Sequence, residues 1–185
     1  MKQLSHNPAR WVARTGVLTA LLIALQWSTV WTQSFAGQYI TGTCVNCVLA
    51  VAALFAGFWS GAAVAVLSPF FAFAFGIGPK LLQIVPCIAI GNLVLVSVLY
   101  LFAGRKQQPV WRKIAALILS AAAKFAVLYT AVVWVVIPLM GDALKPKQVQ
   151  TFTVMFSWPQ LITALLGVTA ALAIVPVLKK AIIKQ

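Results

Sequence analysis

The sequence predicts an all-α integral membrane protein, a compact bundle of six transmembrane helices that forms one domain over residues 1–185. Hydrophobic residues make up 63% of the chain and charged residues only 8%, with a mean hydropathy of +1.01. A water-soluble domain of this length needs a mostly polar exterior, which this composition cannot supply. The few charges are also one-sided, with 14 Lys and Arg against a single Asp.

Six apolar stretches come near the length of about 17–25 residues that crosses the hydrocarbon core of a bilayer. They cover approximately residues 15–31, 44–58, 61–77, 81–102, 114–140 and 152–178. Only a glycine-bracketed turn, "GFWSG", separates the second stretch from the third, so five helices with a re-entrant pair are the alternative. Breaks such as "GIGP" (76–79) are tolerated at membrane depth where they are buried in protein or line a cavity, and they cluster toward one side of the predicted bundle.

Basic residues predict the orientation of the chain, because cytoplasmic loops of membrane proteins are enriched in Lys and Arg. Ten of them fall into three segments that six helices would place on one side: Lys2, Arg10, Arg14, Arg105, Lys106, Arg112, Lys113, Lys179, Lys180 and Lys184. The opposite side would hold only Lys80, Lys145 and Lys147, with Asp142. We therefore expect a multi-pass protein of the cell membrane with both termini cytoplasmic. A cleavable signal peptide ending near "SFA" (34–36) is the alternative, but its apolar run is long for that role and cleavage would break the charge pattern.

Missing residue types exclude several classes of function. There is no GxxxxGK[ST] loop for ATP, Asp142 is the only acid and His6 the only histidine. Paired-carboxylate catalysis, a Ser-His-Asp triad and a zinc hydrolase are therefore excluded, and we expect no enzyme activity, no metal and no cofactor. An intramembrane acid or histidine relay for proton-coupled transport is missing too. Nucleic acid is not an expected partner, because the basic residues form no patch on a water-exposed fold.

Three cysteines give neither a disulfide framework nor a zinc site. Cys44 and Cys47 form a CxxC, a spacing that lowers the pKa of a thiol in redox proteins. No thioredoxin-like βαβ pattern surrounds them, so we interpret these two as small buried side chains.

Lys124 is the sharpest candidate for contact with a ligand. It lies in "ILSAAAKFAVLY" (118–129), about ten residues and hence roughly 15 Å inside the predicted cytoplasmic edge. A lysine there costs several kcal/mol unless it is paired, hydrated or snorkelled. It either contacts an anionic or carbonyl-rich ligand or extends its stem into an aqueous cavity. Asn92, a central amide in "AIAIGNLVL" (88–96), either joins helices or binds the same ligand.

Two further segments carry uncharged polar groups at the predicted outer face. "GQYITGTCVNC" (37–47) is expected to be an outer loop that enters the second helix and contributes to ligand binding. The alternative role of Thr41 or Thr43 is to cap the N-terminus of that helix. "MFSWPQ" (155–160) lies at the same level, although Trp158 also suits an aromatic belt. The predicted substrate-binding residues are Gln38, Tyr39, Thr41, Thr43, Asn46, Asn92, Lys124, Trp158 and Gln160.

The first helix carries a candidate docking stripe. Ala20 and Ala24 in "ALLIALQW" (20–27) are one turn apart on one face, and the stripe stops at an amide, Gln26. Small side chains at this spacing let another helix approach closely, which is how helices associate in lipid. We therefore expect a partner to dock on this face, in the cytoplasmic half of the helix.

These segments together resemble the S component, the substrate-binding membrane subunit, of an energy-coupling factor (ECF) vitamin transporter. The resemblance covers essentially the whole chain and is carried by "TGTCVN" (41–46), "SPFFAFAFGIGP" (68–79), "IVPCIAIGN" (84–92) and the AxxxA of Ala20 and Ala24. It implies capture of a vitamin from outside, docking on a transmembrane coupling subunit through the first helix, and toppling in the bilayer driven by two ATPase subunits.

The candidate residues are compatible with two types of vitamin. The mostly uncharged candidate residues suit a large, amide-rich ligand, so the cobalamin-type branch of the family is the leading interpretation. Lys124 favours an anionic vitamin such as pantothenate or folate instead. A structural membrane subunit without any ligand is the alternative from another class, and a passive channel is disfavoured because no helix shows a polar pore face.

Overall fold

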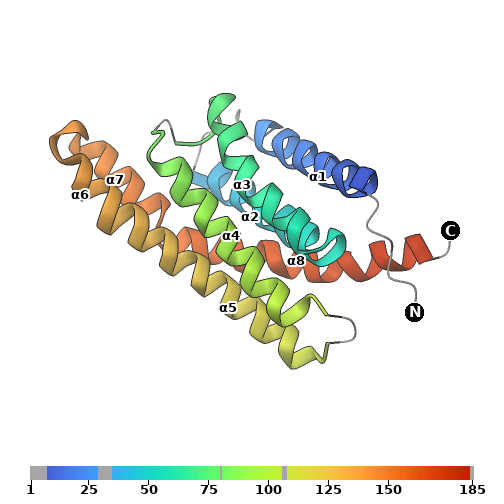
Figure 1. The fold of residues 1–185 in the computed structure, drawn as a ribbon. Helices are drawn as coiled ribbons and strands as arrows, with labels where there is room; N and C mark the ends of the chain where they lie inside the picture. The colour runs from blue at the N-terminus through green and yellow to red at the C-terminus, as the bar shows by residue number, and fades with distance from the viewer. Residues whose placement is uncertain (1–7, 29–34, 80, 106–107, 184–185) are drawn as a thin grey trace.

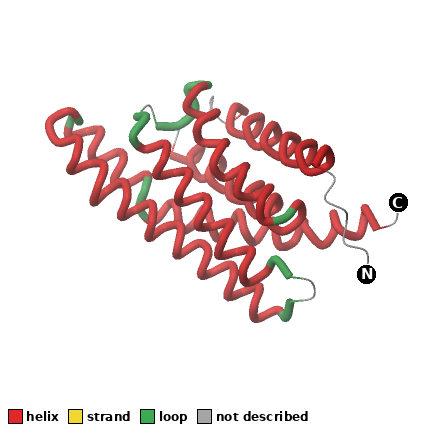
Figure 2. The backbone as a smooth tube through the Cα atoms, in the orientation of Figure 1, coloured by secondary structure: helices red, strands yellow, loops and turns green. Residues whose placement is uncertain are grey.

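The computed structural model describes residues 8–28, 35–79, 81–105 and 108–183 of the chain, and nearly all of them are helical (Figure 2). Some residues named in the sequence analysis lie outside these ranges. They are the predicted end of the first helix at 29–31 and the single residues Lys2, His6, Lys80, Lys106 and Lys184. The helices that cross the bundle are α1 (Pro8–Ser28), α2 (Phe35–Val51), α3 (Phe58–Ala74), α4 (Ile84–Ala103), α5 (Val110–Tyr129) and α8 (Trp158–Ile183). Shorter elements are the π-helical turns η1 (Ala52–Ala56) and η2 (Thr130–Val136), α6 (Ile137–Met140), the 3₁₀ turn η3 (Gly141–Ala143) and α7 (Pro146–Met155).

Within the described part, five helical stretches are long and apolar enough to cross a membrane. The sixth, α3, has 17 residues, and at a rise of about 1.5 Å per residue it falls slightly short of a hydrocarbon core about 30 Å thick. The predicted count of six is therefore approximate. The glycine-bracketed turn exists as expected: Gly57, with φ of 105°, separates η1 from α3.

The segment 37–47 is not an outer loop, and this expectation was wrong. It forms the first turns of α2, which begins at Phe35 instead of near residue 44. Its hydroxyl groups do not need water, because a threonine in a helix can bond to the carbonyl one turn earlier. Thr41 does so, donating from Oγ1 to the carbonyl oxygen of Gly37 at 2.8 Å. Thr41 and Thr43 are therefore interior helix residues and not caps.

The last predicted helix, 152–178, is divided in two. α7 ends at Met155 and α8 begins at Trp158. Pro159 occupies the second position of α8, where its missing N–H removes no hydrogen bond and its ring favours a helix start. The other predicted helices have shifted bounds, and the fifth runs without interruption from Val110 to Met140 through α5, η2 and α6.

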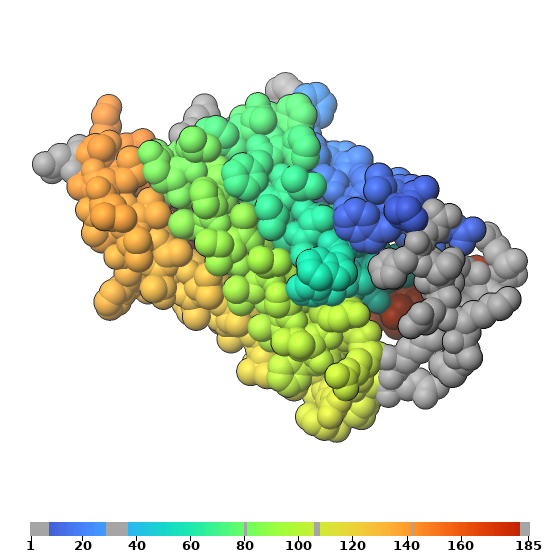
Figure 3. Space-filling model, viewed as in Figure 1, coloured from blue at the N-terminus to red at the C-terminus, as the bar shows by residue number. Residues whose placement is uncertain are grey.

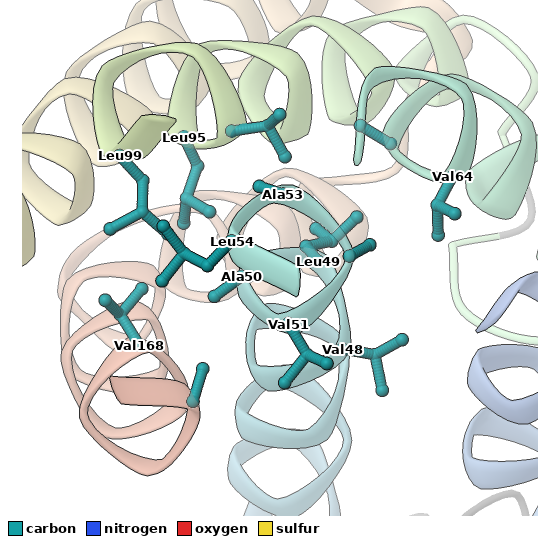
Figure 4. Packing of buried hydrophobic residues seen from close by; sticks show 14 of the residues in the cluster. Val48, Leu49, Ala50, Val51, Ala53, Leu54, Val64, Leu95, Leu99 and Val168 are labelled. Atoms are coloured by element: carbon teal, nitrogen blue, oxygen red, sulfur yellow. The ribbon is translucent and has the colours of Figure 1, made fainter. Parts of the chain in front are cut away.

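The core forms around α2, which packs along α8. In Figure 4, Ala50 of this helix and Leu54 of η1 lie between Leu95 of α4 and Val168 of α8, while Leu49 lies on the side of the helix toward Val64 of α3. A second apolar cluster joins α4, α5, η2 and α7 at one end of the bundle. Large apolar side chains cover much of the outside, as a lipid-facing surface requires.

The bundle has two distinct ends (Figure 1). The start of α1, the end of α8 and the α4–α5 turn lie together at one end, which we call the basic end. Its described basic residues are Arg10, Arg14, Arg105, Arg112, Lys113, Lys179 and Lys180. The opposite end carries the α6–α7 turn and the α3–α4 connection, and we call it the α7 end. This arrangement agrees with the charge pattern of the sequence, while the orientation relative to the cell stays a prediction.

Labelling of single cysteines tests that orientation. In a background without the three native cysteines, Lys113→Cys at the basic end should react only with reagents added from the cytoplasmic side. Lys145→Cys at the α7 end should react only from outside, since positively charged loops are retained in the cytoplasm. Labelling of both positions from the same side would contradict the topology.

Candidate functional site

A cavity of about 900 Å³ opens at the α7 end of the bundle. Its walls come from α2, α3, α4, α5, α7 and α8, and Gln26 near the end of α1 also reaches it. Most of the lining is apolar, and the polar residues that line it are Gln26, Gln38, Thr41, Asn46, Ser68, Asn92, Lys124, Lys147, Gln150, Thr151 and Gln160. A concave, mainly apolar site of this size with a few convergent polar groups is typical of a small-molecule site.

Lys124 of α5 lies at the inner limit of this cavity and is only 3% exposed. Its Nζ donates to Asn46 Oδ1 of α2 at 2.6 Å and to Asn92 Oδ1 of α4 at 2.7 Å. A lysine ammonium has three N–H donors, so these contacts leave one for a group inside the cavity. Among the described residues that line the cavity there is no Asp or Glu. The cation is thus solvated by two amide dipoles but is not neutralised.

Close packing of α2 against α8 orients Asn46. Its Nδ2 donates to Thr163 Oγ1 at 3.4 Å, which directs Oδ1 toward Lys124. A Cβ on Gly167 would lie 2.6 Å from both Asn46 Cβ and the carbonyl oxygen of Thr43, and one on Gly42 would lie 2.9 Å from the Thr163 side chain. Two glycines on facing helices therefore permit the approach that holds this amide.

A third glycine brings Asn92 to the lysine. Gly91 of α4 faces Leu128 of α5, and a Cβ at Gly91 would lie 2.6 Å from Leu128 Cγ. Leu128 is one turn after Lys124 on the same face of α5. The close contact of α4 with α5 at Gly91 therefore also sets the distance at which Asn92, the next residue, meets the ammonium.

Two glutamines close the junction between α7 and α8. Gln38 Nε2 of α2 and Gln160 Nε2 of α8 both donate to the carbonyl oxygen of Met155, each at 3.1 Å. Met155 ends α7, and the last carbonyls of a helix have no partner within it. The two side chains thus satisfy this carbonyl and fix the end of α7 at the cavity wall.

A family model for the substrate-specific component of ECF transporters matches residues 10–179. The chain belongs to this family. The match covers nearly the whole chain, and with the apolar helices it identifies a multi-pass membrane subunit of a transporter. In the same comparisons neither a curated protein nor a solved structure matched. Membership implies a small-molecule substrate, a coupling subunit and ATPases as partners of this substrate-specific component.

The structure brings six of the nine predicted substrate-binding residues of this substrate-specific component to one cavity: Gln38, Thr41, Asn46, Asn92, Lys124 and Gln160. Tyr39, Thr43 and Trp158 are not part of its lining. In a helix, residues 38, 41, 42 and 45 share a face with 46 at its edge, whereas 43 turns away from it; 39, seven residues before 46, lies at the same edge but does not line the cavity. Tyr39 instead contacts Trp158, with ring centroids 6.1 Å apart, and Trp158 is 53% exposed.

Sequence reasoning missed Gln26, Ser68, Lys147, Gln150 and Thr151 as lining residues. For Gln26 the sequence signal was its spacing of four from Leu22, which places both residues on the face of α1 opposite the alanine stripe. The structure shows that both are buried there. The three α7 residues lie at the i, i+3 and i+4 positions of one helix face, a pattern hidden by the expectation of an outer loop there.

Ala20 and Ala24 are both exposed, on the side of α1 that faces away from the bundle. The opposite face is held in place by Thr15, whose Oγ1 donates to Ser60 Oγ of α3 at 2.9 Å. Figure 3 shows α1 (blue) at an outer edge of the molecule next to α3. The predicted stripe is therefore open to a neighbour, and its role in docking stays a prediction.

The glycine contact behind Asn46 can be tested through stability. Gly167→Ala places a methyl group against backbone and should destabilise the isolated protein by about 1–3 kcal/mol, the usual cost of overpacking. Gly16→Ala is the matched control, because a Cβ there has no atom within 4 Å. Thermal unfolding in detergent should show a lower Tm for Gly167→Ala and no decrease for Gly16→Ala. Equal Tm values for the two variants would contradict the close approach of α2 and α8.

Proposed function

We propose that this chain captures a small carboxylate-bearing organic anion, of the kind represented by the vitamins pantothenate and folate, from outside the cell. The observation that carries the proposal is Lys124, a buried cation in the cavity with amide oxygens but no carboxylate beside it. Leaving a charge uncompensated in a low-dielectric interior costs several kcal/mol. An anionic ligand would supply the missing countercharge, so binding energy would be concentrated at this point.

Cobalamin, the leading interpretation from sequence, receives less support. Sites for drug-sized ligands measure about 300–1,000 Å³, so this cavity suits a ligand of that class, and a corrinoid with its nucleotide loop is larger. An overall neutral, amide-rich ligand would also leave Lys124 without a countercharge. A vitamin panel that includes cobalamin, pantothenate and folate separates these substrates from one another and from a structural subunit that binds none.

Delivery of the bound ligand into the cell would depend on a second surface, the alanine stripe of α1. We propose that the basic end is cytoplasmic, that the stripe of Ala20 and Ala24 docks on the transmembrane coupling subunit, and that partner ATPases drive toppling and release. Exposure of both alanines supports this, because small side chains allow close helix contact in lipid. The cavity and the stripe lie on opposite faces of α1, so docking need not obstruct the ligand.

Replacing Lys124 tests the ligand site. Lys124→Met keeps the length of the stem and removes the charge, and a hydrogen bond to a charged group is worth about 1.5–3 kcal/mol. The affinity for the anionic vitamin that binds the wild type should therefore fall about tenfold to a hundredfold, as measured by isothermal titration calorimetry.

Lys113→Met, an exposed position on the same helix, is the charge-matched control and should bind as the wild type does. Cobalamin binding with an unchanged affinity in Lys124→Met would reverse the choice of substrate. Failure of the whole panel to bind the wild type would favour the structural-subunit alternative.

Substitutions in the stripe test docking. Ala20→Trp or Ala24→Trp should strongly reduce ATP-dependent uptake into vesicles that contain the complete transporter, because a bulky side chain prevents close helix approach. Ligand affinity of the isolated subunit should stay nearly unchanged. Leu166→Trp on the exposed side of α8 is the control for a bulky residue on a lipid-facing surface. A parallel loss of affinity in the Ala variants would show that the stripe supports the cavity instead.

A further inference from the structure

A second lysine lines the same cavity. Lys147 in the first turn of α7 belongs to the lining together with Gln150 and Thr151. These residues form one face of α7, and Thr151 Oγ1 bonds back to the carbonyl oxygen of Lys147 at 2.8 Å. Unlike Lys124, Lys147 is exposed, so it marks the rim of the cavity and not its floor.

The position of Lys147 depends on how α7 is packed. Phe152 of α7 and Phe156, the residue after its end, are buried in one cluster with Leu128 and Val132 of the α5–η2 helix, and both also line the cavity. The hydrogen bonds of Gln38 and Gln160 to Met155 hold the end of α7. With Phe152 buried and its last turn held, α7 is fixed so that Lys147, Gln150 and Thr151 line the cavity.

The two lysines lie at opposite ends of the cavity. The chain rises from Lys124 through Met140 and turns back into α7, so a helical rise of about 1.5 Å per residue places the Lys147 backbone roughly 20 Å further toward the α7 end. The two flexible stems shorten the distance between the ammonium groups. Apolar side chains such as Val85, Ile88 and Phe152 line the wall, and no Asp or Glu occurs among the described lining residues.

We propose that the cavity binds an elongated organic dianion, with one acidic group on Lys124, an apolar middle, and a second acidic group on Lys147. This inference rests on the proposed function and narrows its substrate class. A ligand with a single acidic group would satisfy Lys124 but leave Lys147 to act only through screened, long-range attraction. A second acidic group at the rim would form a charge-assisted hydrogen bond there, with Gln150 and Thr151 beside it.

Protection of a cysteine from labelling tests this geometry with defined synthetic probes, whatever the natural ligand is. In the full-length chain without native cysteines, Ile88→Cys is the reporter, since Ile88 lines the cavity one turn of α4 from Asn92. The neutral reagent N-ethylmaleimide avoids any effect of charge on the labelling itself. Suberate, sebacate and dodecanedioate serve as dianionic probes, and the monomethyl ester of each is the matched monoanion.

The rate of labelling should fall at a lower concentration of diacid than of half ester for at least one chain length. We expect a difference of roughly threefold to tenfold, as for a partly exposed charged hydrogen bond. Lys147→Gln should remove this difference. Lys145→Gln should retain it, because Lys145 is an exposed lysine two residues away that does not line the cavity.

Three results would overturn the proposal: equal protection by diacid and half ester, equal behaviour of Lys147→Gln and Lys145→Gln, or no protection by any probe up to its solubility limit. Lys147 would then be an interfacial side chain. Lys124→Gln separates this failure from failure of the proposed function. If half esters protect and Lys124→Gln abolishes the protection, the single-anion site stands; if they protect equally well in Lys124→Gln, the proposed function fails as well.

Discussion

The rest of the site depends on one contact, the Lys124 ammonium held between two asparagine oxygens inside an apolar bundle. Each partner comes from a different helix, so α2, α4 and α5 must approach to hydrogen-bonding distance at the same depth. Gly91 permits the close approach of α4 to α5, and Gly42 and Gly167 permit the packing of α2 against α8 that holds Asn46 in place. In the membrane interior an unsolvated ammonium is costly, and this cost favours the arrangement in which all three helices converge.

The first helix connects the two surfaces that a transporter subunit needs. Its buried face carries Gln26 into the cavity, and its exposed face carries Ala20 and Ala24. Gln26 follows Ala24 by two residues, so the two surfaces share one rigid turn of helix. The hydrogen bond between Thr15 and Ser60 attaches the other end of α1 to α3. A shift of α1 relative to the bundle would therefore move both the cavity wall at Gln26 and the stripe of Ala20 and Ala24.

Sequence reasoning predicted the membrane class, the approximate helices and the positions of Lys124 and Asn92 inside the bundle, because a polar group in a long apolar run stands out against its surroundings. It failed at 37–47, where hydroxyl-rich composition indicated a loop although Thr41 satisfies its own hydroxyl within α2. The loop assignment then hid the phase of the helix, so Tyr39 and Thr43 were grouped with Gln38. α7 was not predicted as a separate helix, because a segment of ten residues with this polarity is too short to give a membrane-helix signal. Partners from distant helices, such as Asn46 for Lys124, follow only from tertiary packing.

The choice of asparagine over aspartate beside Lys124 bears on what the cavity can hold. A carboxylate at either position would neutralise the lysine permanently, and an incoming anion would then face a closed ion pair. Amide oxygens lower the cost of burying the cation through their dipoles, yet leave its full charge available. The fixed direction of Asn46, set by Thr163, means that this solvation needs no rearrangement when a ligand arrives. A site built this way selects for negative charge while the bundle stays intact without it.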